Sequence, residues 1–463
     1  MNAVLLLLGM NGLIGLTLMA LHNQRKISWY LATVSAILLG AITLLAPLDE
    51  ALSLFGAGIK LEPTFRFLGR RFIIDGSNRA AIGYIYLAAA FLFGGGWVAR
   101  ANRFFYSGGT FSLLAIVLSL MVQPFLYAAI FQAGAALAMV FVLVDPRRPA
   151  IQAALRLLLF YILGMMAILM AGWLLDTSGV TAAAPALVER VIRFLAVGFG
   201  VLLIVPPFHL WLPAAADSAQ KYSVAFVPVL LYSTGLFVLL RFMNEFEWMR
   251  SSMVIRDGLR AAGMFMVVLG GLWAVAQRDL ARAMVYLLLA DFGASMILLG
   301  SPAGGYSLAL VMAGARIISV GVWGVGITVL ERVIDRGNVI AGSAYSNPLP
   351  SAAAVVGLIS LGGLPLTAGF PARWGGIQLV GGDYFAAAVI LILGIALAAA
   401  TAARWIWILL SEPEEAPITA ELLPLEKHLI RAGIGLCISI GIFPQLLFPW
   451  ISQALAGLDN LIR

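Results

Sequence analysis

Long apolar runs separated by short polar stretches make up most of this chain. About 20 consecutive apolar residues span the hydrocarbon core of a bilayer, so each run is a candidate membrane-spanning helix. The runs lie near residues 3–21, 28–46, 80–98, 108–124, 126–144, 151–175, 190–212, 225–243, 258–276, 280–300, 304–330, 350–370, 382–410 and 428–450. With a mean hydropathy of +1.00 and 62% hydrophobic residues, this pattern predicts an all-α polytopic membrane protein of about fourteen transmembrane helices.

Two of the runs are broken by proline and glycine. The helix-breaking residues are Pro206, Pro207 and Pro213 at the end of the run 190–212, and Gly362, Gly363 and Pro365 in the run 350–370. Lipid tolerates a break in helical hydrogen bonding only where protein or a water-filled cavity satisfies the freed backbone groups. Interrupted helices in corresponding places of two halves are typical of inverted-repeat transporters. Ion movement is therefore the first functional hypothesis.

No low-complexity linker divides the chain, so we expect one domain with an internal pseudo-repeat. Residues 1–107 supply the first three helices, and the segment 47–79 within them lies outside the membrane. Residues 59–63 and 71–75 alternate weakly between apolar and polar side chains, which predicts a short hairpin. The five helices of residues 108–243 are expected to repeat in residues 258–410, and a last helix lies within 428–463.

The net charge of +7 comes from basic residues scattered over short loops, which fits lipid headgroups better than nucleic acid. With the N-terminus outside, the cytoplasmic loops and helix ends hold Arg25, Lys26, Arg100, Arg103, Arg147, Arg148, Lys221, Arg278, Arg282, Arg332, Arg336 and Lys427. The outer short loops hold mainly Arg190, Arg250, Arg256 and Arg260, although the segment 47–79 adds five basic residues there. The positive-inside rule thus predicts an integral protein of a bacterial or archaeal plasma membrane with both termini outside.

The sequence offers little for cofactor or metal chemistry. Its single cysteine, Cys437, lies in the last apolar run. One cysteine cannot form an internal disulfide, ligate an iron–sulfur cluster or complete a zinc site, and a buried free cysteine usually serves as a small packing residue. We therefore expect no cofactor, no metal and no catalytic redox site in this chain.

Several motifs resemble those of a known family. Residues 197–213, Val-Gly-Phe-Gly-Val-Leu-Leu-Ile-Val-Pro-Pro-Phe-His-Leu-Trp-Leu-Pro, resemble a signature of the antiporter-like subunits of respiratory complex I. The same signature marks their relatives in Mrp-type multisubunit cation/proton antiporters and membrane-bound hydrogenases. Residues 276–286 resemble the segment that enters the family's tenth helix, and residues 361–370 resemble its broken twelfth helix. The motifs follow the family's order over roughly residues 110–410, as in a divergent member.

The resemblance implies a fourteen-helix fold of two inverted five-helix repeats with broken helices 7 and 12, assembled with other membrane subunits. It also implies movement of protons or sodium along a row of charged side chains at mid-membrane depth. An ionisable group at that depth costs roughly 2.5–3.5 kcal/mol on insertion scales, so it persists mainly for function. A row of lysines and a glutamate, with pKa values moved by burial and neighbours, can pass protons between hydrated half-channels.

Position by position, the charged row of the family is largely replaced in this chain. The fifth-helix glutamate falls on Gln132, the seventh-helix lysine on Leu202 and the eighth-helix lysine on or beside Ser233. Histidines common on the tenth and eleventh helices fall on Asp291 and Ala315. Glutamine, leucine, serine and alanine cannot supply a titrating group near neutral pH. The resemblance therefore predicts that the N-terminal half conducts no proton by the family's route.

Four residues remain as candidates for a rerouted ion path: His209, Asp291, Arg316 and Arg373. Asp291, the only acidic residue of its apolar run, is either a protonatable relay group or a structural partner of Arg316 on the next helix. Arg373 falls on the position where the family carries a charged residue in its twelfth helix. It could bind carbonyl groups freed by the second break or attract an anion, and as an arginine it stays protonated. His209, at the first break, could carry protons or bond freed backbone groups.

Three hypotheses stay open at this point. The first is an antiporter-like subunit of a complex I-type NADH:quinone oxidoreductase or related complex, with the glutamate and lysine relay largely lost and a structural role. The second is a stand-alone or Mrp-type ion transporter, or an active subunit, that uses a rerouted path through Asp291 and Arg316. The third is a self-sufficient transporter of a small anion, drawn by Arg316 and Arg373 to the dipole of a broken helix. The replaced relay positions favour the first.

Overall fold

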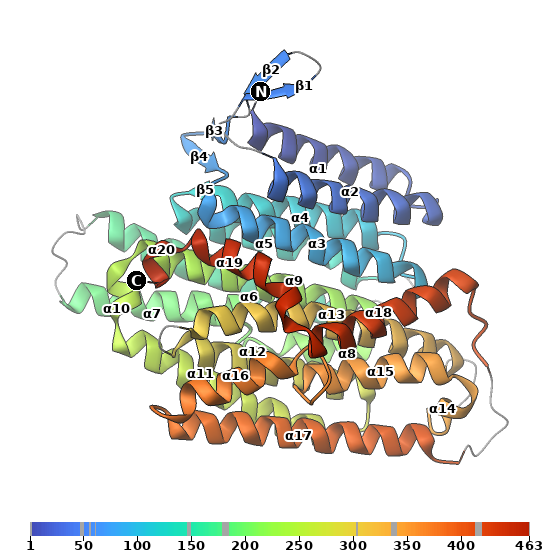
Figure 1. Ribbon diagram of the computed structural model, residues 1–463. Coiled ribbons are helices and arrows are strands. Elements are labelled where there is room, and N and C mark those ends of the chain that lie inside the picture. The colour runs from blue at the N-terminus through green and yellow to red at the C-terminus, as the bar shows by residue number, and fades with distance from the viewer. Residues whose placement is uncertain are drawn as a thin grey trace.

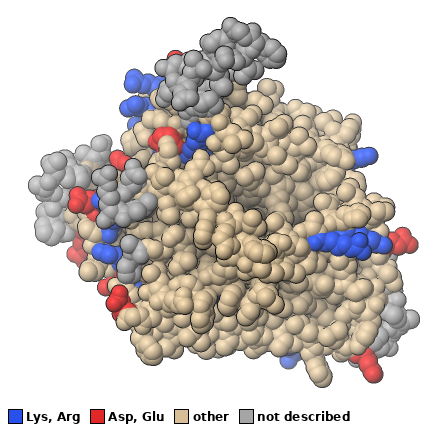
Figure 2. Space-filling model, in the orientation of Figure 1, with Lys and Arg blue, Asp and Glu red and all other residues tan. Residues whose placement is uncertain are grey.

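The computed structural model describes residues 2–46, 51–54, 57–60, 62–145, 150–177, 185–301, 304–334, 340–412 and 419–462. Most of its long helices run side by side in one bundle (Figure 1). Figure 2 shows charged side chains gathered toward the two ends of these helices, while the middle of the visible face is almost free of them. This distribution is typical of an integral membrane protein whose helix ends lie in the headgroup region.

The N-terminal part comprises three long helices and two hairpins. Its elements are α1 (Ala3–Ala20), α2 (Arg25–Leu45), β1 (Ala51–Leu54), β2 (Ala57–Lys60), β3 (Thr64–Phe67), β4 (Arg70–Ile73) and α3 (Gly76–Val98). Side-chain caps begin two of the helices. The Asn2 side chain accepts a hydrogen bond from the Leu5 N–H at 3.1 Å, and Asp75 forms a reciprocal capping box with Asn78 at the start of α3.

The hairpin ahead of α3 differs from the prediction. The sequence suggested that residues 59–63 pair with residues 71–75, but β4 pairs with β3, and β2 pairs with β1 instead. The turn between β3 and β4 consists of Leu68 and Gly69, with φ angles of 47° and 73°. A two-residue turn with positive φ at both positions matches the twist of paired strands, so it fixes this register. β4 also pairs with β5 (Val122–Gln123), which ties the hairpin to the chain after α4.

Two successive groups of helices follow. The first group comprises α4 (Phe105–Met121), η1 (Phe125–Tyr127), α5 (Ala128–Leu143), α6 (Ile151–Thr177), α7 (Pro185–Leu202), α8 (Trp211–Ser218) and α9 (Lys221–Glu245). The second group comprises α10 (Glu247–Ser251), α11 (Met253–Ala276), α12 (Leu280–Leu299), α13 (Gly305–Ile334), α14 (Ser343–Ser346), α15 (Pro348–Leu361), α16 (Phe370–Gly381) and α17 (Phe385–Leu410). The C-terminal elements are α18 (Pro424–Ile442), η2 (Pro444–Leu447), α19 (Phe448–Ala456) and α20 (Asp459–Ile462).

Both predicted helix breaks are confirmed, the first between α7 and α8 and the second between α15 and α16. The two breaks begin with the same backbone motif, in which Ile204 and Gly363 take left-handed φ angles of 56° and 73°. After α7, the Ile204 N–H donates to the Val201 carbonyl oxygen (3.0 Å) and the Val205 N–H donates to that of Gly200 (2.8 Å). After α15, the Gly363 N–H donates to the Ser360 carbonyl oxygen (3.0 Å) and the Leu364 N–H donates to that of Ile359 (3.2 Å). This is a Schellman motif, which satisfies carbonyl groups that a helix end leaves free.

Within the described residues, ten helices are long and apolar enough to cross a membrane, or eleven if the pair on either side of Phe443 is one span. That pair bends by 101°, where Pro444 disfavours helical backbone at the preceding residue, so the last predicted helix forms two. Three other predicted runs form helices that do not meet these requirements. The helices α4 and α15 are too short, and α7 carries three charged residues, Glu189, Arg190 and Arg193. Each predicted run contains a helix, while fourteen crossings and the inverted repeat stay predictions.

The centre of the bundle is formed by α9, α12 and α13. The most apolar stretches of these helices are 100%, 89% and 94% buried within the chain, compared with 39% for the peripheral α17. α11 packs against α12 at glycines: a Cβ atom at Gly263 would lie 2.5 Å from the Gly293 carbonyl oxygen, and one at Gly293 would lie 2.6 Å from the Gly263 carbonyl oxygen. Small residues at such crossings let two backbones approach closely in a membrane, and this one positions α12.

We predict that Gly263→Ala lowers the stability of the purified chain in detergent, because overpacking of this kind costs about 1–3 kcal/mol. Gly258→Ala on the same helix is the control, since a Cβ atom there meets nothing within 4 Å. The control variant should gain up to about 1 kcal/mol from helix propensity. Thermal unfolding midpoints measure both effects, and equal shifts of the same sign would contradict the close approach of α11 and α12.

Candidate functional site

A buried ion cluster joins three elements of the second helix group. Asp291 lies on α12, Arg316 on α13 and Arg373 at the start of α16, and their exposed fractions are 5%, 1% and 3%. The Arg373 Nη2 donates to Asp291 Oδ1 at 2.9 Å, and the Arg316 Nε donates to Asp291 Oδ2. The structure thus brings three of the four sequence candidates together. It pairs Asp291 with both arginines, where the sequence suggested only Arg316.

Aromatic rings and a hydroxyl group hold the Arg316 guanidinium in place. Tyr232 of α9 and Phe292 of α12 stack with ring centroids 3.8 Å apart and planes within 3° of parallel. The Arg316 Cζ lies 4.8 Å from the Tyr232 centroid and 5.0 Å from the Phe292 centroid, within cation–π range. The Arg316 Nη2 also donates to the hydroxyl oxygen of Ser295, one turn after Asp291. These contacts leave the guanidinium a single well-defined position.

The second helix break positions Arg373. A Cβ atom at Gly363 would lie 2.4 Å from the Arg373 Cγ, so the arginine stem occupies the space that glycine leaves open. The Arg373 Nη2 also lies 3.4 Å from the carbonyl oxygen of Leu361, the last residue of α15. The prediction that Arg373 bonds carbonyls at the break is therefore supported by one long contact, whereas its ion pair with Asp291 is shorter and charge-assisted.

The cluster carries more positive than negative charge. Two guanidinium groups share one carboxylate, and the Arg316 Nη1 and Arg373 Nε have no hydrogen-bond partner within the described residues. Both oxygens of Asp291 already accept hydrogen bonds from permanently charged donors. Breaking a buried ion pair of this kind typically costs about 3–5 kcal/mol, because an uncompensated charge is left behind. The arrangement therefore suits an ion cluster that joins the three elements.

The substituted relay positions are buried within the bundle. Gln132 is fully buried, and its Nε2 donates to the hydroxyl oxygen of Ser119 at 3.0 Å. Leu202 is 1% exposed, and its carbonyl oxygen would lie only 2.6 Å from a Cβ atom at Gly235 of α9. Ser233 and Ala315 are buried on α9 and α13. None of the four sequence-derived relay positions offers a group that titrates.

His209 lies apart from the ion cluster, in the segment between α7 and α8. Its side chain is 8% exposed, and its Nδ1 has no hydrogen-bond partner among the residues described. Its backbone carbonyl accepts from the Leu212 N–H at 2.9 Å, where α8 begins. The contacts of Nδ1 therefore give no support to the alternative in which His209 hydrogen-bonds freed backbone groups.

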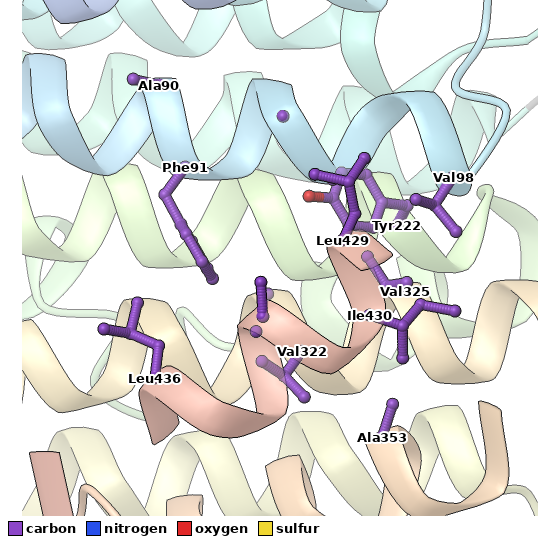
Figure 3. A pocket seen from close by; sticks show the side chains of 15 residues that line it. Ala90, Phe91, Val98, Tyr222, Val322, Val325, Ala353, Leu429, Ile430 and Leu436 are labelled. Carbon is purple, nitrogen blue, oxygen red and sulfur yellow. The ribbon is translucent and has the colours of Figure 1, made fainter. Parts of the chain in front are cut away.

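Two larger hollows in the bundle are apolar. One, of about 280 Å³, lies between α3, α13, α15 and α18, where Phe91, Leu429 and Leu436 point into it (Figure 3). The only polar side chain that lines it is Tyr222, whose hydroxyl donates to the Leu92 carbonyl oxygen at 2.6 Å. A second hollow, of about 310 Å³, lies between α7, α9 and α11 and is lined by apolar residues and glycines. Among the described residues, neither hollow is lined by an acidic, basic or histidine side chain that could extend a proton path.

Several buried residues of this region were not singled out from the sequence. Ser295 could have been found, because it lies four residues after Asp291 and so shares its helix face. Arg241 of α9 was also missed: it is 4% exposed, donates to the Leu120 carbonyl oxygen and lies 4.2 Å from the centroid of the Phe125 ring. Leu120 is in the last turn of α4, so this arginine satisfies a helix-end carbonyl.

Metal ligands do not gather in the part of the chain that the structure describes. No group of three or more His, Cys, Asp or Glu side chains comes together there. Cys437 is buried on α18 and is not part of the ion cluster. The polar chemistry of the site is therefore that of one carboxylate, two guanidinium groups and the hydroxyl groups around them.

Solved structures with similar folds are large membrane complexes. A chain of respiratory complex I from Thermus thermophilus with bound aureothin aligns with a TM-score of 0.73 at 20% identity, over 96% of this chain and 98% of that one. A chain of the membrane-bound sulfane sulfur reductase, an archaeal respiratory membrane complex, gives a TM-score of 0.80 at 15% identity, over 99% and 98%. A chain of the Mrp complex from Dietzia sp. DQ12-45-1b gives 0.72 at 19% identity, over 98% of this chain and 52% of that one.

Sequence comparison gives the family. The chain is 27% identical over 280 residues to NADH-quinone oxidoreductase subunit N 2 of Rhizobium meliloti (59% of this chain, 57% of that protein). It is 27% identical over 319 residues to subunit N 1 of Solidesulfovibrio magneticus (66% and 67%). The chain thus spans 57% and 67% of the length of these two relatives, and 38% of the length of subunit N 2 of Syntrophobacter fumaroxidans. The model of the family described as "NADH:quinone oxidoreductase/Mrp antiporter, TM" matches residues 135–399, more than half of the chain. The chain therefore belongs to the NADH:quinone oxidoreductase/Mrp antiporter family of membrane proteins.

Proposed function

We propose that this chain is an antiporter-like membrane subunit of a complex I-type NADH:quinone oxidoreductase or a related energy-converting complex. Its family membership supports this, as does a fold that aligns over nearly the whole chain with subunits of such complexes. We place it in a bacterial or archaeal plasma membrane, beside other membrane subunits and with both termini outside. The basic residues of its short loops support that orientation.

Within that complex we infer a structural role rather than a proton relay. The observation that carries this inference is the contact of both Asp291 oxygens with Arg316 and Arg373 in a buried position. A relay group must alternate between protonated and deprotonated states at a reachable free energy. Protonation of Asp291 would leave two buried guanidinium groups without their counter-charge, which is strongly unfavourable.

The first half supports the same role. The positions that carry the relay glutamate and lysines in the resembling family are occupied here by Gln132, Leu202 and Ser233, all buried. The proton or sodium ion moved by the parent complex would then cross through other subunits. This chain would contribute scaffold, and the Asp291–Arg316–Arg373 cluster would hold its second half together.

We predict that Asp291→Asn strongly impairs assembly, because it leaves two buried arginines unpaired at a cost of about 3–5 kcal/mol. The double variant Asp291→Asn/Arg373→Gln restores the wild-type net charge of the cluster and should recover assembly. Once assembled, it should pump as the wild type does, since it lacks no group that the proton uses. NADH-driven proton uptake by inverted membrane vesicles measures this. An assembled double variant that oxidises NADH but no longer pumps would contradict the structural role and favour the rerouted path.

We also predict that Gly363→Ala weakens the cluster through Arg373. The new Cβ atom collides with the arginine stem, and its left-handed φ adds strain of roughly 1–2 kcal/mol. Gly382→Ala is the control, because a Cβ atom there meets nothing within 4 Å. Thermal midpoints should fall for Gly363→Ala only.

A double-mutant cycle separates this effect from simple backbone strain. Gly363→Ala and Asp291→Asn both act on the Arg373–Asp291 contact, so their effects should be less than additive by at least about 0.5 kcal/mol. Full additivity in the thermal or denaturant unfolding of the purified variants would show that Gly363 does not position Arg373 for Asp291.

A further inference from the structure

A polar pocket lies at one end of the bundle, where the turn between α1 and α2 meets the turn between α3 and α4. Its volume is about 190 Å³, and the polar side chains that line it include His22, Arg25, Ser28, Asn102, Arg103 and Tyr106. In contrast to the two apolar hollows, seven of the eight residues that line this pocket have polar side chains. It is separate from the ion cluster and independent of the proposed function.

Two buried groups at this pocket lack a partner. The Tyr106 side chain is 2% exposed, and its hydroxyl makes no hydrogen bond within the described residues. The Nε of Arg25 is also buried and unpartnered, although the Nη2 of the same arginine donates to the Trp97 carbonyl oxygen at 3.3 Å. Buried donors are almost always satisfied in folded proteins, so each unpaired one calls for a ligand or water.

The rest of the pocket wall is held rigidly. Asn102 donates from Nδ2 to the Val142 carbonyl oxygen at 3.0 Å and accepts from the Phe104 N–H at 3.0 Å. His22 stacks on Phe104, with ring centroids 5.4 Å apart, and its Nδ1 bonds the Met19 carbonyl oxygen at 3.0 Å. A wall that is already ordered binds a ligand with little further loss of conformational entropy.

The charge of the pocket is positive. Arg25 and Arg103 line it, Lys26 and Arg100 are close to them in the sequence, and none of its lining residues is acidic. Glu426, the acidic residue whose charge acts on Arg25, does not line the pocket. Its carboxylate accepts from the Leu423 N–H at 2.9 Å, at the start of its own helix. The complementary ligand is therefore an anion, and arginine favours phosphate oxygens.

The position of the pocket indicates which molecule would supply such a phosphate group. α1 ends at Ala20, α2 begins at Arg25 and α4 begins at Phe105, so the pocket lies at the level of helix ends, where lipid headgroups lie. Large apolar side chains are exposed on the two helices that lead away from it: Leu16, Met19, Ile27, Tyr30 and Val34. Basic pockets between transmembrane helices bind phospholipid headgroups in this way.

We propose that this pocket binds the phosphate group of an anionic phospholipid, whose acyl chains lie along the exposed faces of α1 and α2. Arg25 and Arg103 supply the charge, and the Tyr106 hydroxyl donates a hydrogen bond to a phosphate oxygen. The bound lipid would bridge the turn between α1 and α2 and the start of α4.

The test is a titration of the purified, delipidated full chain in detergent with phosphatidylglycerol, followed by native mass spectrometry and thermal unfolding. We expect one tightly retained phosphatidylglycerol and a raised unfolding midpoint, with phosphatidylcholine binding much more weakly. Loss of a hydrogen bond to a charged group typically weakens binding about tenfold or more, which is the effect expected for Arg25→Gln. Tyr106→Phe removes only the hydroxyl and should weaken binding several-fold while the chain stays folded.

Lys26→Gln is the matched control, because it removes one charge beside Arg25 from a residue that does not line the pocket. Its affinity for phosphatidylglycerol should stay within about twofold of wild type, since exposed charges contribute little. Equal losses for Lys26→Gln and Arg25→Gln, or equal retention of phosphatidylcholine, would overturn the proposal. If inorganic phosphate alone raised the midpoint as much as the lipid does, the pocket would be a free-anion site and the lipid assignment would be wrong.

Discussion

The second half of this protein depends on one carboxylate held between two guanidinium groups away from water. Asp291, Arg316 and Arg373 come from three separate helices, so their ion pairs join α12, α13 and α16 in a buried position where an isolated charge is strongly unfavourable. Several other features serve this contact. Gly363 leaves room for the Arg373 stem, the Tyr232–Phe292 stack supports Arg316, and the close approach of α11 positions α12.

Broken helices in a membrane protein are commonly taken as a sign of an ion path, but here hydrogen bonds within the chain occupy two carbonyl groups at the start of each break. Each begins with a Schellman motif that binds the free carbonyls of the helix end. The first break leads to apolar packing around α7 and α9, and the second presents an arginine to the ion cluster. The fold of the family is thus retained, with apolar packing after the first break and a buried ion cluster after the second.

The helical class, the two breaks and the residues of the ion cluster could be predicted from the sequence, because hydropathy, proline and isolated charges in apolar runs are local signals. The pairing of Asp291 with Arg373 could not, since the two residues are 82 positions apart and meet only through the fold. The partner of β4 was predicted wrongly, because weak alternation in residues 59–63 competed with a turn at Leu68 and Gly69 that lacked a strong signal. The bend at Pro444 was likewise hidden within one continuous apolar run.

If the proposed structural role is correct, Asp291 stays paired with both arginines as a carboxylate while the proposed parent complex turns over. Difference infrared spectroscopy of the assembled complex, with and without NADH, tests it most directly, with the Asp291→Asn/Arg373→Gln variant used to assign the signal. We expect no protonated-carboxyl band that the variant removes. A carboxylic acid band that appears during turnover in the wild type and is absent from the variant would show that Asp291 takes up a proton, and the structural role would then be wrong.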